Sequence, residues 1–144
     1  MSREERIYSK MLKIYPDLKS MQVGDHRKIS NDPFMALSLD VLADHPIGRI
    51  IALAHNSEMN GDLMADPDMQ ILINLDLGKA SPMTYQNDWL GVYQESLSFT
   101  DDGDLSIQPA LLKDLTEFLD MWTQNLLDQG FAEASADQEA AHGE

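Results

Sequence analysis

The chain contains no cysteine, which excludes disulfide bonds, thiolate metal ligands and cysteine nucleophiles. It also has no apolar run near the roughly 20 residues that a membrane-spanning helix needs. Its first residues, MSREER, are charged and lack the apolar stretch of a signal peptide. From these absences we expect a cytoplasmic protein with no membrane partner.

Basic residues are scarce and unevenly distributed. The net charge of the 144 residues is −15, and no Lys or Arg follows Lys113. Residues 1–50 carry a net charge of +1, whereas residues 51–113 and residues 114–144 carry −8 each. Such a field repels nucleic-acid phosphates and attracts basic protein surfaces. We expect no direct contact with nucleic acid and, if the charge serves more than solubility, a basic protein partner.

The hydrophobic pattern predicts a helix near each end of the chain. Residues 2–15 place apolar side chains on one face, and Ser2 and Glu5 have the spacing of a capping box. A second apolar stripe begins at Pro109, and Gly130 supplies a left-handed cap after it. The first helix also carries a basic face, which contacts an anion, is solvated, or pairs with acids of the same chain: Arg3, Arg6, Lys10 and Lys13.

Between the helices, alternating apolar residues predict an antiparallel sheet of about five strands. The expected strands span residues 34–41, 48–54, 69–75, 83–86 and 89–95, and residues 17–33 form an irregular connector. The expected fold is α+β, with both helices packed on one face of the sheet. This single domain covers residues 1–131. Residues 132–144 form an acidic Ala/Glu-rich tail, either frayed or helical and docked on something else.

The stretch from His55 to Met69, HNSEMNGDLMADPDM, concentrates acidic side chains between two predicted strands. Its Asn-Gly and Asp-Pro pairs are turn signals, so we expect a loop. A second acidic turn follows at residues 101–104. The candidate residues for binding a basic partner are Glu58, Asp62, Asp66, Asp68, Asp101, Asp102 and Asp104.

The same loop supports an alternative hypothesis. His55, Glu58 and Asp62 are ligand types for a divalent cation, and a carboxylate beside a histidine can make it a general base. Their spacing matches neither a helix-borne zinc pair nor a calcium loop, and no nucleophile accompanies them. No cofactor is therefore predicted for the principal hypothesis. A divalent metal belongs to the alternative, a metal-dependent hydrolase or small-ligand-binding protein.

Apolar side chains flank these acids. Tyr85, Trp89 and Tyr93 lie along the predicted hairpin and either pack in the core or form an aromatic binding surface. Met59, Met64 and Met69 either adapt to a protein partner or fill gaps at the rim of the core. Both alternatives stay open at the level of the sequence.

Several short motifs occur together: NGDLM at residues 60–64, DPDM at 66–69 and YQNDWLG at 85–91, with His55 and the helix end at 122–131. This set resembles an uncharacterised bacterial family carried on plasmids and other mobile elements, over roughly residues 34–131. The resemblance implies no activity and no catalytic residues. It does imply a setting in which small acidic proteins are frequently inhibitors of host defence, some by imitating the charge of DNA. Our principal hypothesis is a non-catalytic acidic interaction protein that inhibits a nucleic-acid-handling defence protein by charge mimicry.

Overall fold

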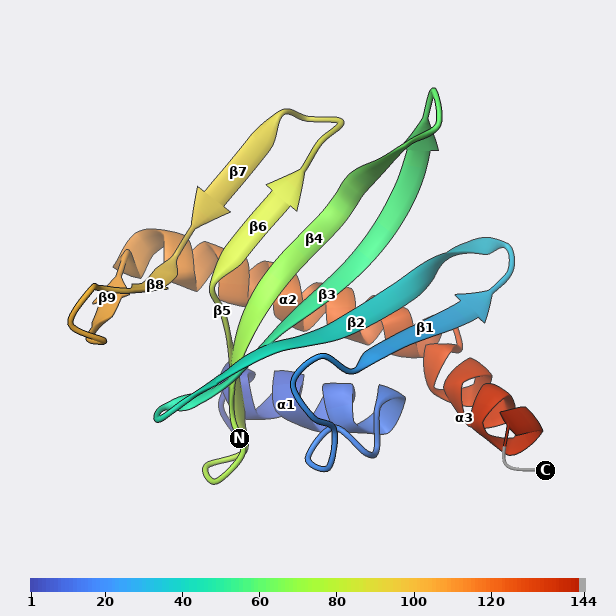
Figure 1. Cartoon of the computed structure of the whole chain (residues 1–144), viewed down its shortest axis with the longest axis horizontal. Coiled ribbons are helices and arrows are strands. Elements are labelled where there is room, and N and C mark those ends of the chain that lie inside the picture. Colours follow the sequence, from blue (N-terminus) through green and yellow to red (C-terminus); the bar gives the residue numbers. More distant parts are fainter. Residues whose placement is uncertain (143–144) are drawn as a thin grey trace.

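The chain is α+β, with a helix near each end and an antiparallel sheet between them (Figure 1). The computed structural model describes the backbone of residues 1–142 and the side chains of residues 1–139. The helices are α1 (Arg3–Ile14), α2 (Pro109–Asp128) and α3 (Phe131–His142). The strands are β1 (His26–Asn31), β2 (Phe34–His45), β3 (Gly48–Met59), β4 (Asp62–Asn74), β5 (Lys79–Pro82), β6 (Thr84–Asn87), β7 (Val92–Glu95), β8 (Leu97–Phe99) and β9 (Leu105–Ile107). None of the described helices has the length and apolar character needed to cross a bilayer.

The main sheet has seven strands, more than the expected five. Its order is β1-β2-β3-β4-β6-β7, and β5 pairs with the part of β4 that β6 leaves free. Strand β1 lies in the predicted connector, where only Ile29 is buried and no apolar alternation marks it. Leu97 and Phe99, beyond the last expected strand, lie in β8, which pairs with β9 in a separate sheet. The strands of the main sheet that were not expected, β1 and β5, are polar or short, so no local pattern marks them.

The two expected helices are confirmed by their caps. The Ser2 hydroxyl accepts a hydrogen bond from the Glu5 amide, and the Glu5 carboxylate accepts one from the Ser2 amide, both at 3.2 Å. Beyond the end of α2, Gly130 has a φ of +89°, the left-handed conformation that glycine adopts without strain. The cap therefore fixes where α1 begins, and the glycine fixes where the chain turns from α2 into α3.

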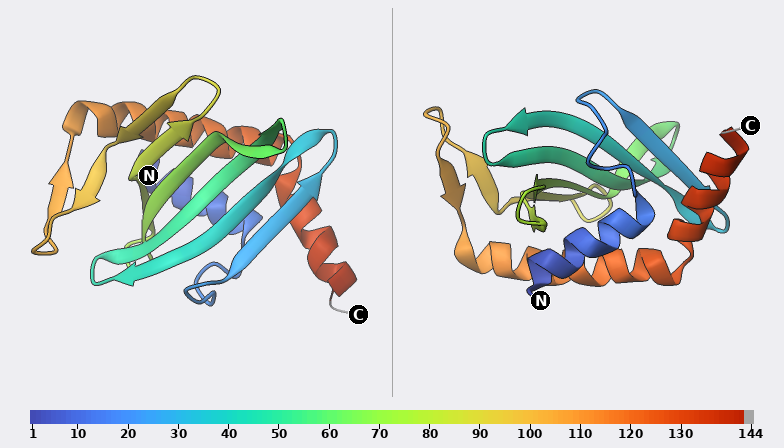
Figure 2. Two further views of the ribbon diagram at one scale, coloured as in Figure 1. Left: turned by 45° about the horizontal axis from the view of Figure 1, so that its top comes forward. Right: turned by 90° about the horizontal axis from the view of Figure 1, so that it is seen from below.

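Helices α1 and α2 cover one face of the sheet, as expected (Figure 2). Their buried side chains include Ile7 and Met11 of α1 and Leu119 and Leu126 of α2. From the sheet, alternate residues of β2, β3 and β4 complete this core: Leu37, Leu39, Val41, Ile51, Leu53, Met69, Ile71 and Ile73. On the opposite face, Leu72 forms a smaller buried cluster with side chains of β8 and β9.

Most of the predicted tail forms α3, which docks on strand β1 of the same chain (Figure 2). Phe131 is fully buried at the start of this helix. Further along, the side-chain amide of Gln138 bonds to the backbone of β1. Its Oε1 accepts a hydrogen bond from the Ser30 N–H at 2.8 Å, and its Nε2 donates one to the Lys28 carbonyl at 3.2 Å. The helical alternative is therefore the correct one, and the docking surface is the chain's own sheet. Residues 143–144 of the predicted tail lie outside the described residues.

Candidate functional site

The central stretch, expected to be a loop, is the end of a long hairpin between β3 and β4. Asn60 and Gly61 form its two-residue turn, with φ values of +54° and +87°. Asn-Gly is the sequence preferred where both turn residues need positive φ, and this turn matches the twist of the flanking strands. The Asn60–Gly61 turn signal was therefore read correctly, but the Asp66–Pro67 signal was not, because this pair lies within β4. The two strands also extend much further toward the Asn60–Gly61 turn than predicted.

A bulge divides the acids of β4 between the two faces of the sheet. The pairing register shifts between Ala54, which faces Asp68, and Asn56, which faces Ala65. Because side chains alternate along a strand, this shift reverses which residues of β4 face the helices. Asp62 lies on the side of the helices, whereas Asp68 lies on the open face. The two carboxylates therefore do not belong to one surface.

Asp68 is half-buried on the open face, in the middle of the sheet. Burial raises the pKa of its carboxyl, and the nearby carboxylates of Asp40 and Asp88 raise it further. Asp40 also accepts a hydrogen bond from His26, whose Nδ1 lies 2.7 Å from the Asp40 carboxylate. A groove of about 360 Å³ runs beside this pair between β1, β2 and the β3–β4 hairpin, and Glu58 lines it. Of the predicted binding residues, only Asp68 and Glu58 contribute to the open face near this groove.

His55 lies under the sheet rather than in a polar site. Its ring is buried against Trp122 and Phe131, with centroid distances of 5.6 and 5.8 Å. Its Nδ1 lies 3.1 Å from the Ala36 carbonyl, which can only accept, so the neutral ring donates from Nδ1. Burial lowers the pKa of His55, although the bond to Ala36 and the charge of Asp66 oppose that shift.

We expect His55 to make stability depend on pH. A histidine with a lowered folded-state pKa stabilises the fold above its unfolded value of 6.5, and this stability is lost as the pH falls toward the folded pKa. In urea unfolding measured from neutral pH to about pH 5, the free energy of unfolding should therefore fall more steeply with decreasing pH for the wild type than for His55→Gln. Parallel curves for the two proteins would contradict this assignment.

The ligands of the metal hypothesis do not converge. His55 points toward the helices, while Glu58 and Asp62 are exposed near the hairpin turn. Within the described part of the chain, no group of three or more His, Asp or Glu side chains is placed to hold a metal ion. The geometry therefore gives this alternative no ligand set.

The remaining acids lie elsewhere. Asp101, Asp102 and Asp104 are exposed around the β8–β9 turn, at a different corner of the molecule from the β3–β4 turn (Figure 1). None of the seven predicted binding acids forms an ion pair with a described residue. Their charge is therefore not paired within the described residues, but it is spread over separate parts of the fold.

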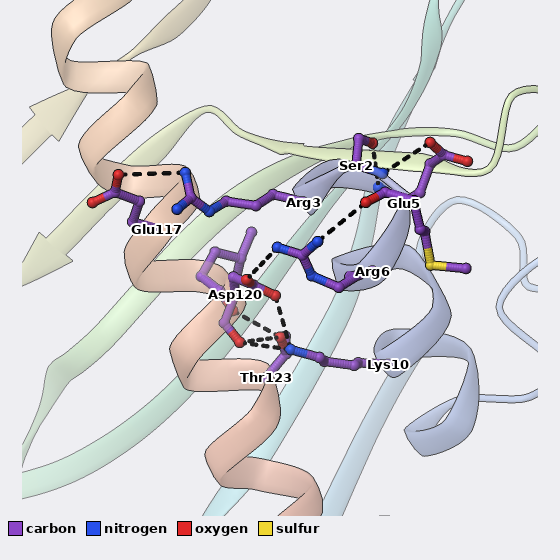
Figure 3. A network of polar contacts seen from close by, with 10 residues as sticks. Ser2, Arg3, Glu5, Arg6, Lys10, Glu117, Asp120 and Thr123 are labelled. Atoms are coloured by element: carbon purple, nitrogen blue, oxygen red, sulfur yellow. Dashed lines mark hydrogen bonds and ion pairs between the residues drawn. The ribbon is translucent and has the colours of Figure 1, made fainter.

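Much of the positive charge, by contrast, is neutralised inside the molecule. Figure 3 shows Arg3 of α1 paired with Glu117 of α2 at 3.4 Å, and Arg6 and Lys10 paired with Asp120 at 3.2 and 2.8 Å. Although burial opposes it, these hydrogen bonds lower the pKa of Asp120. Three of the four basic residues of α1 thus pair with acids of α2, whereas Lys13 forms no ion pair with a described residue.

Two neighbouring hairpin ends carry exposed apolar side chains that the sequence did not bring together. The Trp89 indole donates a hydrogen bond to the Ser57 hydroxyl at 2.6 Å. Asp88 joins the same two hairpins, because its carboxylate accepts from the Ala65 amide at 2.7 Å and its amide donates to the Ala65 carbonyl at 2.9 Å. The exposed large apolar residues on these ends are Met59, Leu63, Trp89, Leu90 and Tyr93. We call this surface the hairpin ends, defined as residues 57–64 and 88–93.

The aromatic residues of the β6–β7 hairpin therefore do not form one cluster. Tyr85 packs under the sheet against Phe118, with ring centroids 5.2 Å apart. Trp89 lies in the turn and Tyr93 on β7, and both are exposed. The aromatic residues could be picked out from the sequence as a candidate binding surface. The contact between Trp89 and Ser57 could not, because it depends on how the β3–β4 and β6–β7 hairpins pack against each other.

A protein-family model described as a domain of unknown function (DUF6908) matches residues 8–132. The chain belongs to this family. No curated protein and no solved structure was found to match it. The DUF6908 match takes in most of α1, both sheets and α2, which is more of the chain than the motifs at residues 34–131 covered. Most of α3 lies beyond the DUF6908 match, and the family description assigns no activity, so the function must be argued from the geometry.

Proposed function

We propose that this DUF6908 protein is a non-catalytic interaction protein that binds a basic protein surface through the hairpin ends. The observation that carries the proposal is the exposure of five large apolar side chains on two hairpins joined by Trp89 and Asp88. Their exposed fractions range from 46% for Met59 to 70% for Leu63 and Leu90. Aromatic residues and methionine are enriched at protein interfaces, and tryptophan and tyrosine are frequent hot spots.

The charge around these residues supports a basic partner. Glu58, on the open face, and Asp62, on the side of the helices, flank the β3–β4 turn from its two sides. Both are exposed, and neither has a cationic partner among the described residues. Acids at the rim of an apolar patch steer a basic protein toward it and orient it on arrival. The binding should therefore be fast and should weaken as salt is added.

In its most specific form, the proposal names a nucleic-acid-handling protein as the partner. In the mobile-element setting, that protein would belong to host defence, and the chain would inhibit it by charge mimicry. The hairpin ends would then present Glu58 and Asp62 where the partner normally holds phosphates. Asp101, Asp102 and Asp104 lie around the β8–β9 turn, at a different corner of the molecule (Figure 1), so they are not part of the hairpin ends.

The test is capture of partners from bacterial lysate at low and high salt, followed by mass spectrometry. Reversing both charges in Glu58→Lys/Asp62→Lys is expected to reduce capture of the salt-sensitive partner by about tenfold. The matched control is Asp101→Lys/Asp102→Lys, which changes the net charge equally at the β8–β9 turn and should leave capture unchanged.

A second pair of variants separates the apolar contribution. Leu63→Ser and Leu90→Ser, both at exposed positions, should weaken capture without lowering the melting temperature. Equal loss in the control of the β8–β9 turn would show that total charge alone attracts the partner. Unchanged capture in all hairpin-end variants would refute the proposal. Competition by duplex DNA for the captured protein then tests mimicry.

A further inference from the structure

A small cavity lies between strand β1 and helix α3, away from the hairpin ends. Its volume is about 220 Å³. Tyr15, from the end of α1, lines it together with Arg27 and Lys28 of β1 and Ser135 and Glu139 of α3. The walls therefore include one guanidinium, that of Arg27, which is paired with the Glu139 carboxylate, together with the side chains of Tyr15 and Ser135.

The Tyr15 hydroxyl is the most unusual group of this cavity. Tyr15 is only 2% exposed, and its hydroxyl has no hydrogen-bond partner within the described structure. Burial raises the pKa of Tyr15, so the hydroxyl keeps its proton and remains a donor; the nearby Arg27 cation only partly opposes the rise. Buried polar groups are nearly always satisfied by protein, water or a ligand. A donor without an acceptor at the wall of a cavity therefore points to an acceptor that the chain does not supply.

Arg27 shows which kind of acceptor fits. Its guanidinium forms ion pairs with Asp17, in the turn after α1, and with Glu139, whose carboxylate lies 2.7 Å from Nη1. The Glu139 side chain is 62% exposed, and an exposed ion pair of this kind contributes little to stability. Glu139 therefore places a carboxylate where a free oxyanion would bind the guanidinium, and it can be displaced at low cost.

We propose that this cavity binds a small oxyanion, a phosphate or a short carboxylate, on Arg27 in place of Glu139. The guanidinium donates to the oxyanion, and the Tyr15 hydroxyl supplies the further donor that now lacks an acceptor. A cavity of about 220 Å³ suits an anion of this size and is smaller than the sites that hold drug-sized ligands.

The test is an amide NMR titration of the full chain with sodium phosphate and, separately, with sodium succinate, at ionic strength held constant with sodium chloride. Saturable shifts of residues at the cavity, such as Ile29 and Ser135, are expected with at least one oxyanion and not with chloride. Shifts with phosphate alone or succinate alone identify the preferred class. Glu139→Gln should bind about three- to fivefold more tightly, because the competing carboxylate is gone. Arg27→Gln should abolish binding.

Two tyrosine variants provide the matched comparison. Tyr8 and Tyr15 both bury a hydroxyl without a partner in the described structure, but only Tyr15 lines the cavity. Neither Tyr→Phe change removes a hydrogen bond of the chain, so both variants should fold. Tyr15→Phe should weaken oxyanion binding about tenfold, and Tyr8→Phe should leave it unchanged. Equal affinities for the two variants, or no saturable shift in either the wild type or Glu139→Gln, would overturn the proposal.

Discussion

Replacing Phe131 by alanine is expected to lower the free energy of unfolding by about 3 to 5 kcal/mol. Phe131 is fully buried, and its ring lies 5.8 Å from that of His55 and 6.4 Å from that of Phe34. Alanine would leave a cavity at the junction of α2, α3 and the sheet, because these rigid elements cannot all close around it. Urea denaturation followed by circular dichroism measures the change.

The matched control for this prediction is Phe34→Ala. Phe34 is the aromatic neighbour of Phe131 in β2, but it is 40% exposed. Phe34→Ala should therefore lower the free energy of unfolding clearly less than Phe131→Ala does. If the two variants lose the same stability, or if Phe131→Ala loses less than about 1 kcal/mol, Phe131 is not the anchor that joins α3 to the domain.

Replacing Arg49 by methionine is expected to lower the free energy of unfolding by about 3 kcal/mol or more. Arg49 is only 9% exposed, and its Nη1 donates to the carbonyls of Leu18 and Met21 in the connector between α1 and β1. Methionine is similar in length but carries no donor, so both carbonyls would lose this partner in a buried environment. The expected result is a lower urea midpoint and faster amide exchange in that connector.

Asp44 provides the control for Arg49. Its carboxylate accepts from Arg49 Nε at 2.9 Å, and this bond lowers the pKa of Asp44, although its side chain is largely exposed. Asp44→Asn should therefore have a much smaller effect than Arg49→Met. An equally large loss in Asp44→Asn would mean that the ion pair, rather than the two carbonyl bonds, is the main contribution of Arg49.

The helices could be predicted because their signals are local. The capping box at Ser2 and Glu5, and the glycine at position 130, determine chain direction over a few residues. Helix α3 lacked such a signal. It has no apolar stripe beyond Phe131, and its position depends on polar contacts with a strand about 100 residues earlier in the sequence.

The extent of the β3–β4 hairpin could not be predicted because the hairpin extends beyond the cover of the helices. From Asn56 to Leu63 both sides of the hairpin meet solvent, so the residues show no alternation between apolar and polar types. A period of two marks a strand only where one face is buried. The Asn60–Gly61 turn signal was correct, but nothing local showed how far the strands continue on either side of it.

The candidate sites illustrate the same limit. Composition predicted an acidic protein but not which acids lie together, because the bulge opposite His55 places Asp62 and Asp68 on different faces. The contact between Trp89 and Ser57 joins residues 32 positions apart. The cavity beside Tyr15 depends on α1, β1 and α3 meeting at one point. Such arrangements follow from the tertiary structure and leave no short motif.

The bonds of Gln138 give the acidic C-terminal segment a role that its composition conceals. By donating to the Lys28 carbonyl and accepting from the Ser30 amide, the Gln138 side chain makes the two bonds that the N–H and C=O of one residue would make in a parallel neighbouring strand. Strand β1 is the first in the sheet order, and an uncovered edge of this kind is a template for intermolecular strand addition and fibril growth. Helix α3 therefore occupies hydrogen-bonding groups on the free edge of β1. Removing α3 would expose that edge to other strands and would also make the net charge of the protein less negative.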